Sequence, residues 1–288
     1  MKIAVLSDIH GNMPALEAVT DHIERWQPDQ VVVNGDIVNR GPRSDACLGF
    51  LMQKVEKGNW LLLRGNHEDF VARCADIKPP HSGPKYEVLK FAHWSYHQVE
   101  DQVSYLKNLP EQYEWQAPDG QLLRVTHASM INNRDGLYPM MSDNDFRERI
   151  APAPAVFVTG HTHRALIRQI DDSLVVNTGA VGAPFDDDRR ASYAQFTWDE
   201  QSGWHAEIVR IPYDYEQIER DYVESGFLDE AGPLAYLMLI ELRKATGLVY
   251  LWIDRYQEAM LAGEISMEAS VQALIDEVVD VKEKRPLL

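Results

Sequence analysis

Five short apolar runs along the chain alternate with polar clusters. They are rich in Val, Leu and Ile, and each ends directly before polar residues. The runs lie at residues 3–6, 31–33, 60–63, 122–126 and 155–158. Continuous apolar runs of this length are typical of strands that are buried on both faces. The pattern therefore predicts five buried strands.

Between the first three runs, apolar residues recur at helical spacing. Asn12 with Pro14 is typical of a helix start, and a second helical segment begins near Ser44. The alternation of strands and helices predicts a layered α/β fold. From about residue 166 to 211 strand-like runs follow one another closely, which predicts an antiparallel portion.

Beyond Tyr213 the chain is almost wholly helical in pattern. Pro233 begins a long helical segment to about residue 261, and a second segment runs over residues 267–281. We therefore expect a body at residues 1–212 and a helical C-terminal appendage at residues 213–288. The apolar stripe of this tail must be buried, either as a cap on the body or as the contact surface of a homodimer. In both cases we expect the tail to contribute stability or assembly, with the active site lying before residue 200.

The composition is that of an ordinary soluble globular chain. Its 288 residues are 45% hydrophobic and 25% charged, and 28 Lys and Arg against 45 Asp and Glu give a net charge of −17. This balance opposes specific binding to nucleic acid or to an anionic membrane, because both depend on Lys and Arg. No apolar run reaches the length of about 20 residues that a membrane span needs. We therefore expect a cytoplasmic protein.

Polar clusters rich in Asp, Asn and His follow the predicted strands. Ligands of α/β sheets bind at the carboxyl ends of strands, so these side chains are candidates for one site. Their oxygen and imidazole donors, without thiolate, suit Mn, Fe, Co, Ni or Zn. The clusters are Asp8-Ile9-His10, Gly35-Asp36 with Arg40-Gly41, Gly65-Asn66-His67-Glu68, Thr126-His127 and Gly160-His161-Thr162-His163.

In this order the clusters resemble the motifs of the calcineurin-like metallophosphoesterase superfamily, over residues 1 to about 200. The resemblance is to its small bacterial phosphodiesterases and diadenosine tetraphosphatases, and it implies mixed β-sheets flanked by helices. It also implies two divalent metal ions, with Mn favoured, of which Asp36 would bridge both. The first ion would be held by Asp8, His10, Asp36 and His163, and the second by Asp36, Asn66, His127 and His161.

The resemblance further implies catalytic roles. His67 is similar to the family's proton donor to the leaving group, and Arg40 is similar to its phosphate-binding arginine. Two divalent ions carry a charge of +4, and only two of the implied ligands are anionic, so a phosphate is attracted despite the net charge of −17. We therefore expect hydrolysis of a small phosphomonoester or phosphodiester by a hydroxide held between the ions.

Other functions stay open beside this one. The Arg40-Gly41-Pro42 box is similar to that of dinucleoside polyphosphate hydrolases. A serine/threonine protein phosphatase is less favoured, because Asn39 stands where those enzymes have an aspartate that orients the proton donor. A catalytically inactive metal-binding scaffold is a further alternative, although no ligand is missing. A nuclease is opposed by the acidic composition and the lack of a basic stripe.

The stretch of residues 76–114 carries many aromatic side chains, including Phe91 and Trp94. Such a segment can form a lid over a site. The same spacing is typical of a packed helix, which is the interpretation that we favour.

Overall fold

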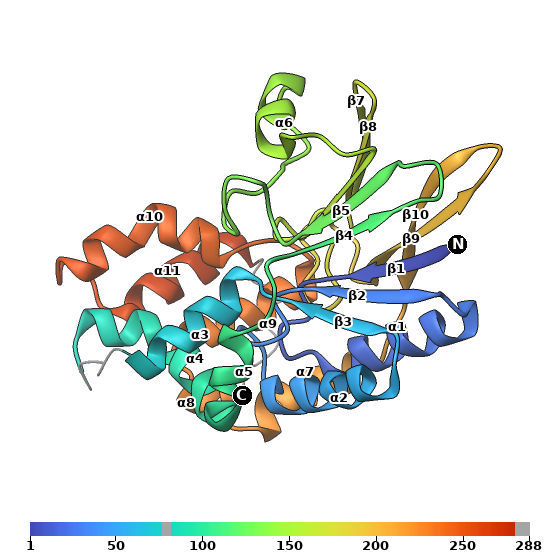
Figure 1. The fold of residues 1–288 in the computed structure, drawn as a ribbon. Coiled ribbons are helices and arrows are strands. Elements are labelled where there is room, and N and C mark those ends of the chain that lie inside the picture. Colours follow the sequence, from blue (N-terminus) through green and yellow to red (C-terminus); the bar gives the residue numbers. More distant parts are fainter. Residues whose placement is uncertain (77–81, 280–288) are drawn as a thin grey trace.

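Two five-stranded β-sheets pack face to face at the centre of the molecule (Figure 1). The computed structural model describes residues 1–76 and 82–279. The first sheet has the order β10-β9-β1-β2-β3, in which β1, β2 and β3 are parallel and β9 runs antiparallel to β1 and β10. Its strands are β1 (Lys2–Leu6), β2 (Gln30–Asn34), β3 (Trp60–Leu63), β9 (Ala191–Asp199) and β10 (Gly203–Ile211).

The second sheet has the order β4-β5-β6-β8-β7. Strands β5, β6 and β8 are parallel, whereas the edge strands β4 and β7 run antiparallel to their neighbours. The strands are β4 (Gln112–Gln116), β5 (Leu122–Thr126), β6 (Val156–Thr159), β7 (Leu166–Ile170) and β8 (Ser173–Asn177). Both sheets are therefore mixed, which confirms the predicted α/β fold class.

The alternation of side chains along β1 explains why the strand is apolar throughout. Ile3 and Val5 belong to the core between the two sheets, together with Val125 of β5. Ala4 and Leu6 point the other way, into the core beneath the helices. Both faces are thus buried, as the continuous apolar run predicted.

Helices cover the outer face of each sheet (Figure 1). Helices α1 and α2 pack on the first sheet, and α6 packs on the second. The helices of the body are α1 (Met13–Trp26), α2 (Ser44–Lys57), α3 (Asn66–Asp76), α4 (Pro84–Gln98), the 3₁₀ turn η1 (Glu100–Gln102), α5 (Val103–Lys107) and α6 (Asp143–Ile150). The tail comprises α7 (Tyr215–Glu224), α8 (Phe227–Glu230), α9 (Leu234–Lys244), α10 (Val249–Leu261) and α11 (Met267–Val278).

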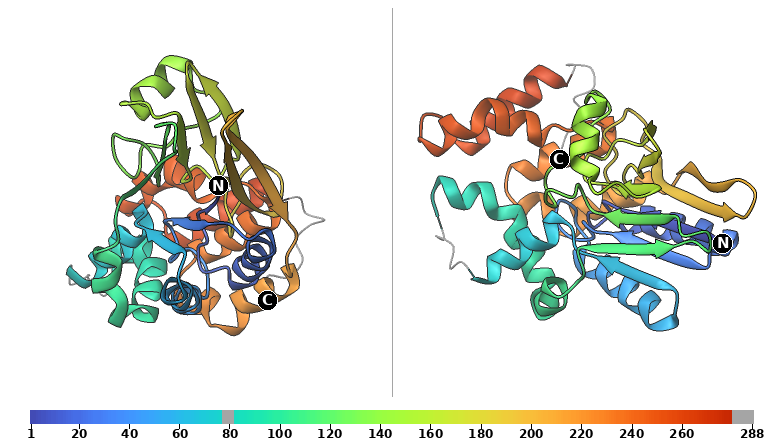
Figure 2. Two further views of the ribbon diagram at one scale, coloured as in Figure 1. Left: turned by 45° about the vertical axis from the view of Figure 1, so that its right-hand side comes forward. Right: turned by 45° about the horizontal axis from the view of Figure 1, so that its top comes forward.

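The tail helices share a core with the body. Leu237 of α9 and Leu274 of α11 belong to the same apolar cluster as Leu6 of β1. Figure 1 and the right-hand view of Figure 2 show α9, α10 and α11 at the end of the sheets opposite the N-terminus. No helix within residues 1–76 and 82–279 is both long and apolar enough to cross a membrane.

Helix α4 lies in the stretch of residues 76–114. It buries Phe91 in the core, and the ring of Trp94 meets that of Phe227 edge to face. These contacts are those of a packed helix, although residues 77–81 of the stretch lie outside the described residues.

The predicted single helix from Pro233 to residue 261 is wrong. The chain leaves α9 at Ala245, whose φ of 51° is left-handed, and α10 begins only at Val249. A buried carboxylate, that of Glu241, accepts hydrogen bonds from the backbone N–H groups of Leu248 and Val249 and so stabilises this break. The last helix ends at Val278, and residues 280–281 of the predicted segment lie outside the described residues.

Trp252 joins α10 to α11 and provides a test of this packing. The side chain is fully buried, and its Nε1 donates to Ser270 Oγ at 2.9 Å. Trp252→Ala should therefore lower the free energy of unfolding by about 3–5 kcal/mol, measured by thermal or urea unfolding. The neighbouring Ile253 is 41% exposed, so Ile253→Ala serves as the control and should change stability by less than about 0.5 kcal/mol. Equal stability of the two variants would contradict the packing described for the tail.

Candidate metal centre

The five polar clusters meet where the parallel strands of both sheets end. Asp8 and His10 follow β1, and Asp36 follows β2. The remaining three loops follow β3, β5 and β6, and they carry Asn66 with His67, His127, and His161 with His163. The carboxyl ends of the two facing sheets therefore bring residues that are far apart in the sequence to one place.

Six of the predicted ligands form two groups that can hold a metal ion, and Asp36 belongs to both. Within each group, the ligand atoms lie within 4.8 Å of one another, and every member is buried. The first group is Asp8, His10, Asp36 and His163, and the second is Asp36, His127 and His161.

Asn66 completes the second group. Its Oδ1 lies 3.0 Å from His127 Nε2 and 2.8 Å from His161 Nδ1. The structure thus brings together all seven residues that the resemblance implies as metal ligands.

The hydrogen bonds of His10 and His163 show that this arrangement fits a cation. The Nδ1 atoms lie 3.2 Å from the carbonyl oxygen of Asn39 and 2.5 Å from that of Ala183, respectively. A carbonyl only accepts, so each Nδ1 carries the proton and each Nε2 presents a lone pair. The two Nε2 atoms face each other at 3.2 Å. Two converging lone pairs are favourable only around a shared cation.

Asp8 gives a second indication of the same fit. Its side chain is fully buried, and Oδ1 has no hydrogen-bond partner, although Oδ2 accepts from Ser7 Oγ and from the backbone N–H of His161. Burial opposes ionisation, but positive charge at the facing His163 and at His127 together outweighs burial, so the pKa of Asp8 lies below its usual value. A buried, ionised oxygen without a partner is a ligand atom suited to a metal.

His127 shows the same pattern in the second group. Its Nδ1 donates to the carbonyl of Asn34 at 2.8 Å, which leaves Nε2 facing Asp36 Oδ2 at 3.2 Å and the amide oxygen of Asn66. Burial disfavours the charged imidazole, but Asp36, Asp8 and the Asn34 carbonyl together outweigh burial and raise the pKa of His127 to about 10. The surrounding oxygen atoms therefore favour a positive charge at Nε2, whether proton or metal.

The backbone of the ligand loops is strained. Among the described residues, 11 amino acids other than glycine have positive φ, and seven of them lie in the loops that carry the polar clusters. The seven are Asp8, His10, Asp36, Asn39, Arg40, His161 and His163. Left-handed backbone of this kind costs on the order of 1 kcal/mol or more per residue and is concentrated at functional sites.

Glu68 holds the Asp36 loop in place, and the sequence analysis assigned it no role. Its buried carboxylate accepts the backbone N–H groups of Asp36 at 2.7 Å, Ile37 at 2.8 Å, Val38 at 3.3 Å and Gly65 at 2.8 Å. Its place in the first turn of α3 is the signal that points to this role, because a carboxylate there faces unpaired N–H groups.

His67 lies beside the two groups with a fixed orientation. Its ring centre is 4.9 Å from that of His10, and its Nδ1 is 2.8 Å from Asn39 Nδ2. Asn39 Oδ1 accepts the backbone N–H of Arg40, so the amide NH₂ group is the part that faces His67. His67 Nδ1 therefore accepts, and the proton of the neutral ring is on Nε2. Burial lowers the pKa of His67 to about 3, against the attraction of Asp36.

Arg40 lies close to the first group but outside both. Its side chain is buried and, together with His10, lines a small cavity. The guanidinium donates from Nη2 to Glu241 of α9 at 2.6 Å. The sequence analysis missed Glu241, although a single acidic residue among the apolar positions of the helix was a visible signal.

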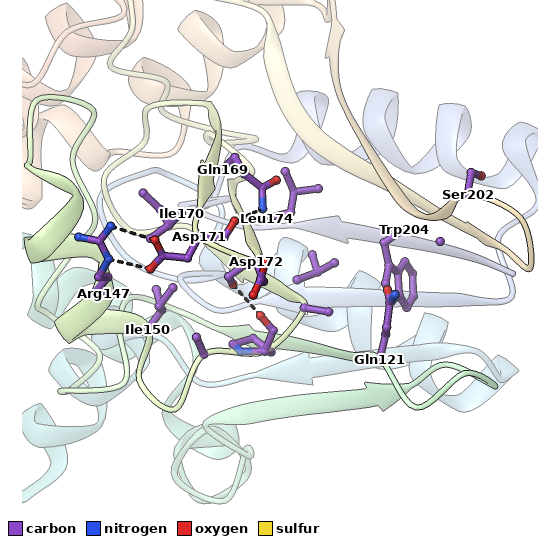
Figure 3. Close-up of a pocket in the computed structure, with 16 residues that line it drawn as sticks. Gln121, Arg147, Ile150, Gln169, Ile170, Asp171, Asp172, Leu174, Ser202 and Trp204 are labelled. Carbon is purple, nitrogen blue, oxygen red and sulfur yellow. Dashed lines mark hydrogen bonds and ion pairs between the residues drawn. The ribbon is translucent and has the colours of Figure 1, made fainter.

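A separate cleft of about 680 Å³ contains none of the predicted site residues (Figure 3). Trp204, Leu174 and the ion pair of Arg147 with Asp171 lie along it. It is formed at the amino ends of β6 and β8, whereas the metal ligands follow the carboxyl ends of the strands. The cleft is therefore not part of the candidate metal centre.

Comparison with known proteins identifies a family. The family of calcineurin-like phosphoesterases matches residues 1–172. An uncharacterized protein of Methanocaldococcus jannaschii is 25% identical over 82% of this chain and 97% of its own length. Phosphodiesterase YfcE of Escherichia coli K12 is 27% identical over 64% of this chain and 81% of its own length. A metallophosphoesterase structure from Sphaerobacter thermophilus has a similar fold, with a TM-score of 0.64, 21% identity and coverage of 85% of this chain and 99% of that chain.

The family match spans more than half of the chain and includes all seven predicted metal ligands. The buried groups around Asp36 are suited to divalent metal ions. The chain therefore belongs to the calcineurin-like phosphoesterase family and is a hydrolase of phosphoric esters.

Proposed function

We propose that the protein hydrolyses small phosphodiesters or phosphomonoesters with two divalent metal ions, manganese being favoured. The observation that carries this proposal is the sharing of Asp36 by two buried ligand groups. Their oxygen and nitrogen donors, without sulfur, suit Mn, Fe, Co, Ni or Zn, and manganese is our preference among these. The name of the phosphodiesterase relative favours diesters over monoesters.

The bound ions would supply charge neutralisation for the phosphoryl oxygens and lower the pKa of an attacking water. The protein's own residues then orient the substrate. Arg40 offers a guanidinium that can bind a phosphoryl oxygen, and His67 presents Nε2–H toward the leaving-group oxygen.

Asn39 bears on the choice of leaving group. A neutral amide at His67 Nδ1 does not stabilise a charged imidazole as an aspartate does. Such a site favours leaving groups that need little protonation, such as aryl oxides and phosphates. The second candidate function, hydrolysis of dinucleoside polyphosphates, is consistent with this preference because its leaving group is a phosphate.

Removal of metal gives the first test. Activity toward an aryl phosphodiester should fall to background after dialysis against a chelator, because no protein group replaces the ions. It should return on addition of divalent metal, best with manganese. Undiminished turnover in protein that elemental analysis shows to be free of metal would contradict the proposal.

The two aspartates should differ in their effect on metal content. Asp36→Asn should lower the number of bound metals as well as the rate, because Asp36 is proposed to contact both ions. Asp8→Asn, the matched control, should affect one ion. Metal analysis that finds two ions at full occupancy in the Asp36→Asn protein would disprove the bridging role.

His67→Ala should lower the rate by roughly 10²–10³-fold while both metals stay bound, because the leaving-group oxygen loses one oriented hydrogen-bond donor, the Nε2–H of His67. The loss should be smaller for p-nitrophenyl esters than for alkyl esters, because p-nitrophenolate leaves without a proton. The measurement is kcat on the two ester types. The same loss on both would assign His67 a different role.

A further inference from the structure

Arg40 is enclosed by residues of the C-terminal tail. Among the described residues, the one hydrogen bond that its guanidinium donates is that from Nη2 to Glu241 Oε2, at 2.6 Å. The guanidinium carbon lies over the rings of Phe185 and of Tyr250 of α10, 5.7 Å from each ring centre. Tyr222 of α7 donates its hydroxyl to the Arg40 carbonyl at 3.3 Å. Three tail residues thus hold one arginine of the body.

Glu241 is itself fixed by the tail. Its Oε1 accepts the backbone N–H groups of Leu248 at 2.6 Å and Val249 at 2.7 Å, at the start of α10. The side chain is buried, with 3% of its surface exposed. One carboxylate therefore uses one oxygen to hold the start of α10 and the other to hold Arg40, which leaves it little freedom to move.

Two further contacts connect the surroundings of Arg40 with the candidate metal centre. Phe185, whose ring lies below the Arg40 guanidinium, stacks on the ring of the metal-ligand candidate His163 with ring centres 4.3 Å apart. His10, Arg40 and Glu241 line one small cavity. A guanidinium has five N–H donors, so Arg40 keeps donors for a phosphoryl oxygen while bound to Glu241.

We infer that Glu241 is a positioning residue that aims Arg40 at the phosphoryl group, so that the C-terminal tail completes the substrate site. This inference rests on the proposed phosphoesterase function. It replaces the expectation that the tail contributes only stability or assembly. Tyr250, which is 45% exposed, adds a cation–π contact from the tail to the guanidinium.

The physical reason is the cost of a buried charge without a partner. Arg40 is 5% exposed, and a buried guanidinium that loses its carboxylate turns toward water or toward another acceptor. Glu241 thus fixes the orientation of the Arg40 side chain, because the paired guanidinium keeps its charge-assisted hydrogen bonds in a fixed geometry.

The test measures the binding of inorganic phosphate to the manganese-loaded full-length protein by isothermal titration calorimetry. Glu241→Gln should raise the Kd for phosphate, and the KM for an aryl ester, at least about tenfold, because a charge-assisted hydrogen bond is lost. Metal content should be unchanged. Asp221→Asn is the matched control: Asp221 is also a buried tail carboxylate, and it pairs with Arg43 at 3.0 Å in the same loop. The control should leave both constants within about twofold.

A double variant separates positioning from a general loss of stability. Arg40→Gln combined with Glu241→Gln should bind phosphate no more weakly than Arg40→Gln alone, because Glu241 acts through Arg40. Additive losses would overturn the inference. An unchanged or lower phosphate Kd in Glu241→Gln would also overturn it, the latter by showing that Glu241 masks Arg40.

Tyr250→Leu keeps the inference testable where Glu241→Gln fails to fold, since Tyr250 is partly exposed. Loss of a cation–π contact should raise the phosphate Kd by about twofold to fivefold, and an unchanged value would overturn the role of the tail.

Wild-type protein that neither binds phosphate nor hydrolyses any ester would refute the proposed function. Wild-type activity with a Glu241→Gln protein that behaves like the Asp221→Asn control would refute the inference alone.

Discussion

Two buried carboxylates determine the arrangement of the centre of this protein, because their negative charge must be compensated. Asp8 and Asp36 lie at the ends of β1 and β2 with 0% and 1% of their surface exposed. Isolated charges at such depth are strongly disfavoured, and three neighbouring imidazoles are oriented to favour a cation beside them. Imidazole protons point away, to backbone carbonyls, and nitrogen lone pairs point inward. The same arrangement that would be unfavourable without positive charge makes a strong binding site for divalent metal.

The sandwich of two sheets provides the rigidity that this centre requires. The ligand loops adopt left-handed backbone at seven positions other than glycine, and such strain persists only when the surrounding structure holds it. Strands with apolar side chains on both faces provide that support. Close contacts also limit the loops: a Cβ on Gly65 would lie 2.2 Å from Asp36 Oδ1, so the approach of the β3 loop to Asp36 requires glycine.

Local patterns explain why much of the fold and site could be predicted from the sequence. A buried strand and the polar cluster after it are contiguous in the chain, so β1 with Asp8 and His10, or β6 with His161 and His163, are recognisable without tertiary information. Tertiary contacts determine the features that the sequence did not predict. The helix predicted across Ala245 is broken where Glu241 binds the start of α10, and the pairing of Glu241 with Arg40 joins residues 201 positions apart. Neither contact is indicated by a local periodic pattern in the sequence. A single acidic residue within an apolar helix face does indicate a position where a buried polar contact is expected.

The charge balance around Arg40 indicates how an acidic protein attracts a phosphate. With a net charge of −17, the surface as a whole repels anions. Glu241 neutralises Arg40, so this arginine adds almost no net positive charge to the site. In the proposed function, the attraction comes from the metal ions that the buried aspartates would hold, and Arg40 contributes directed hydrogen bonds in place of long-range charge. In this proposal, attraction and orientation of the phosphate come from different parts of the molecule: the metal centre at the strand ends of the body provides the attraction, and Glu241 of the C-terminal tail orients Arg40.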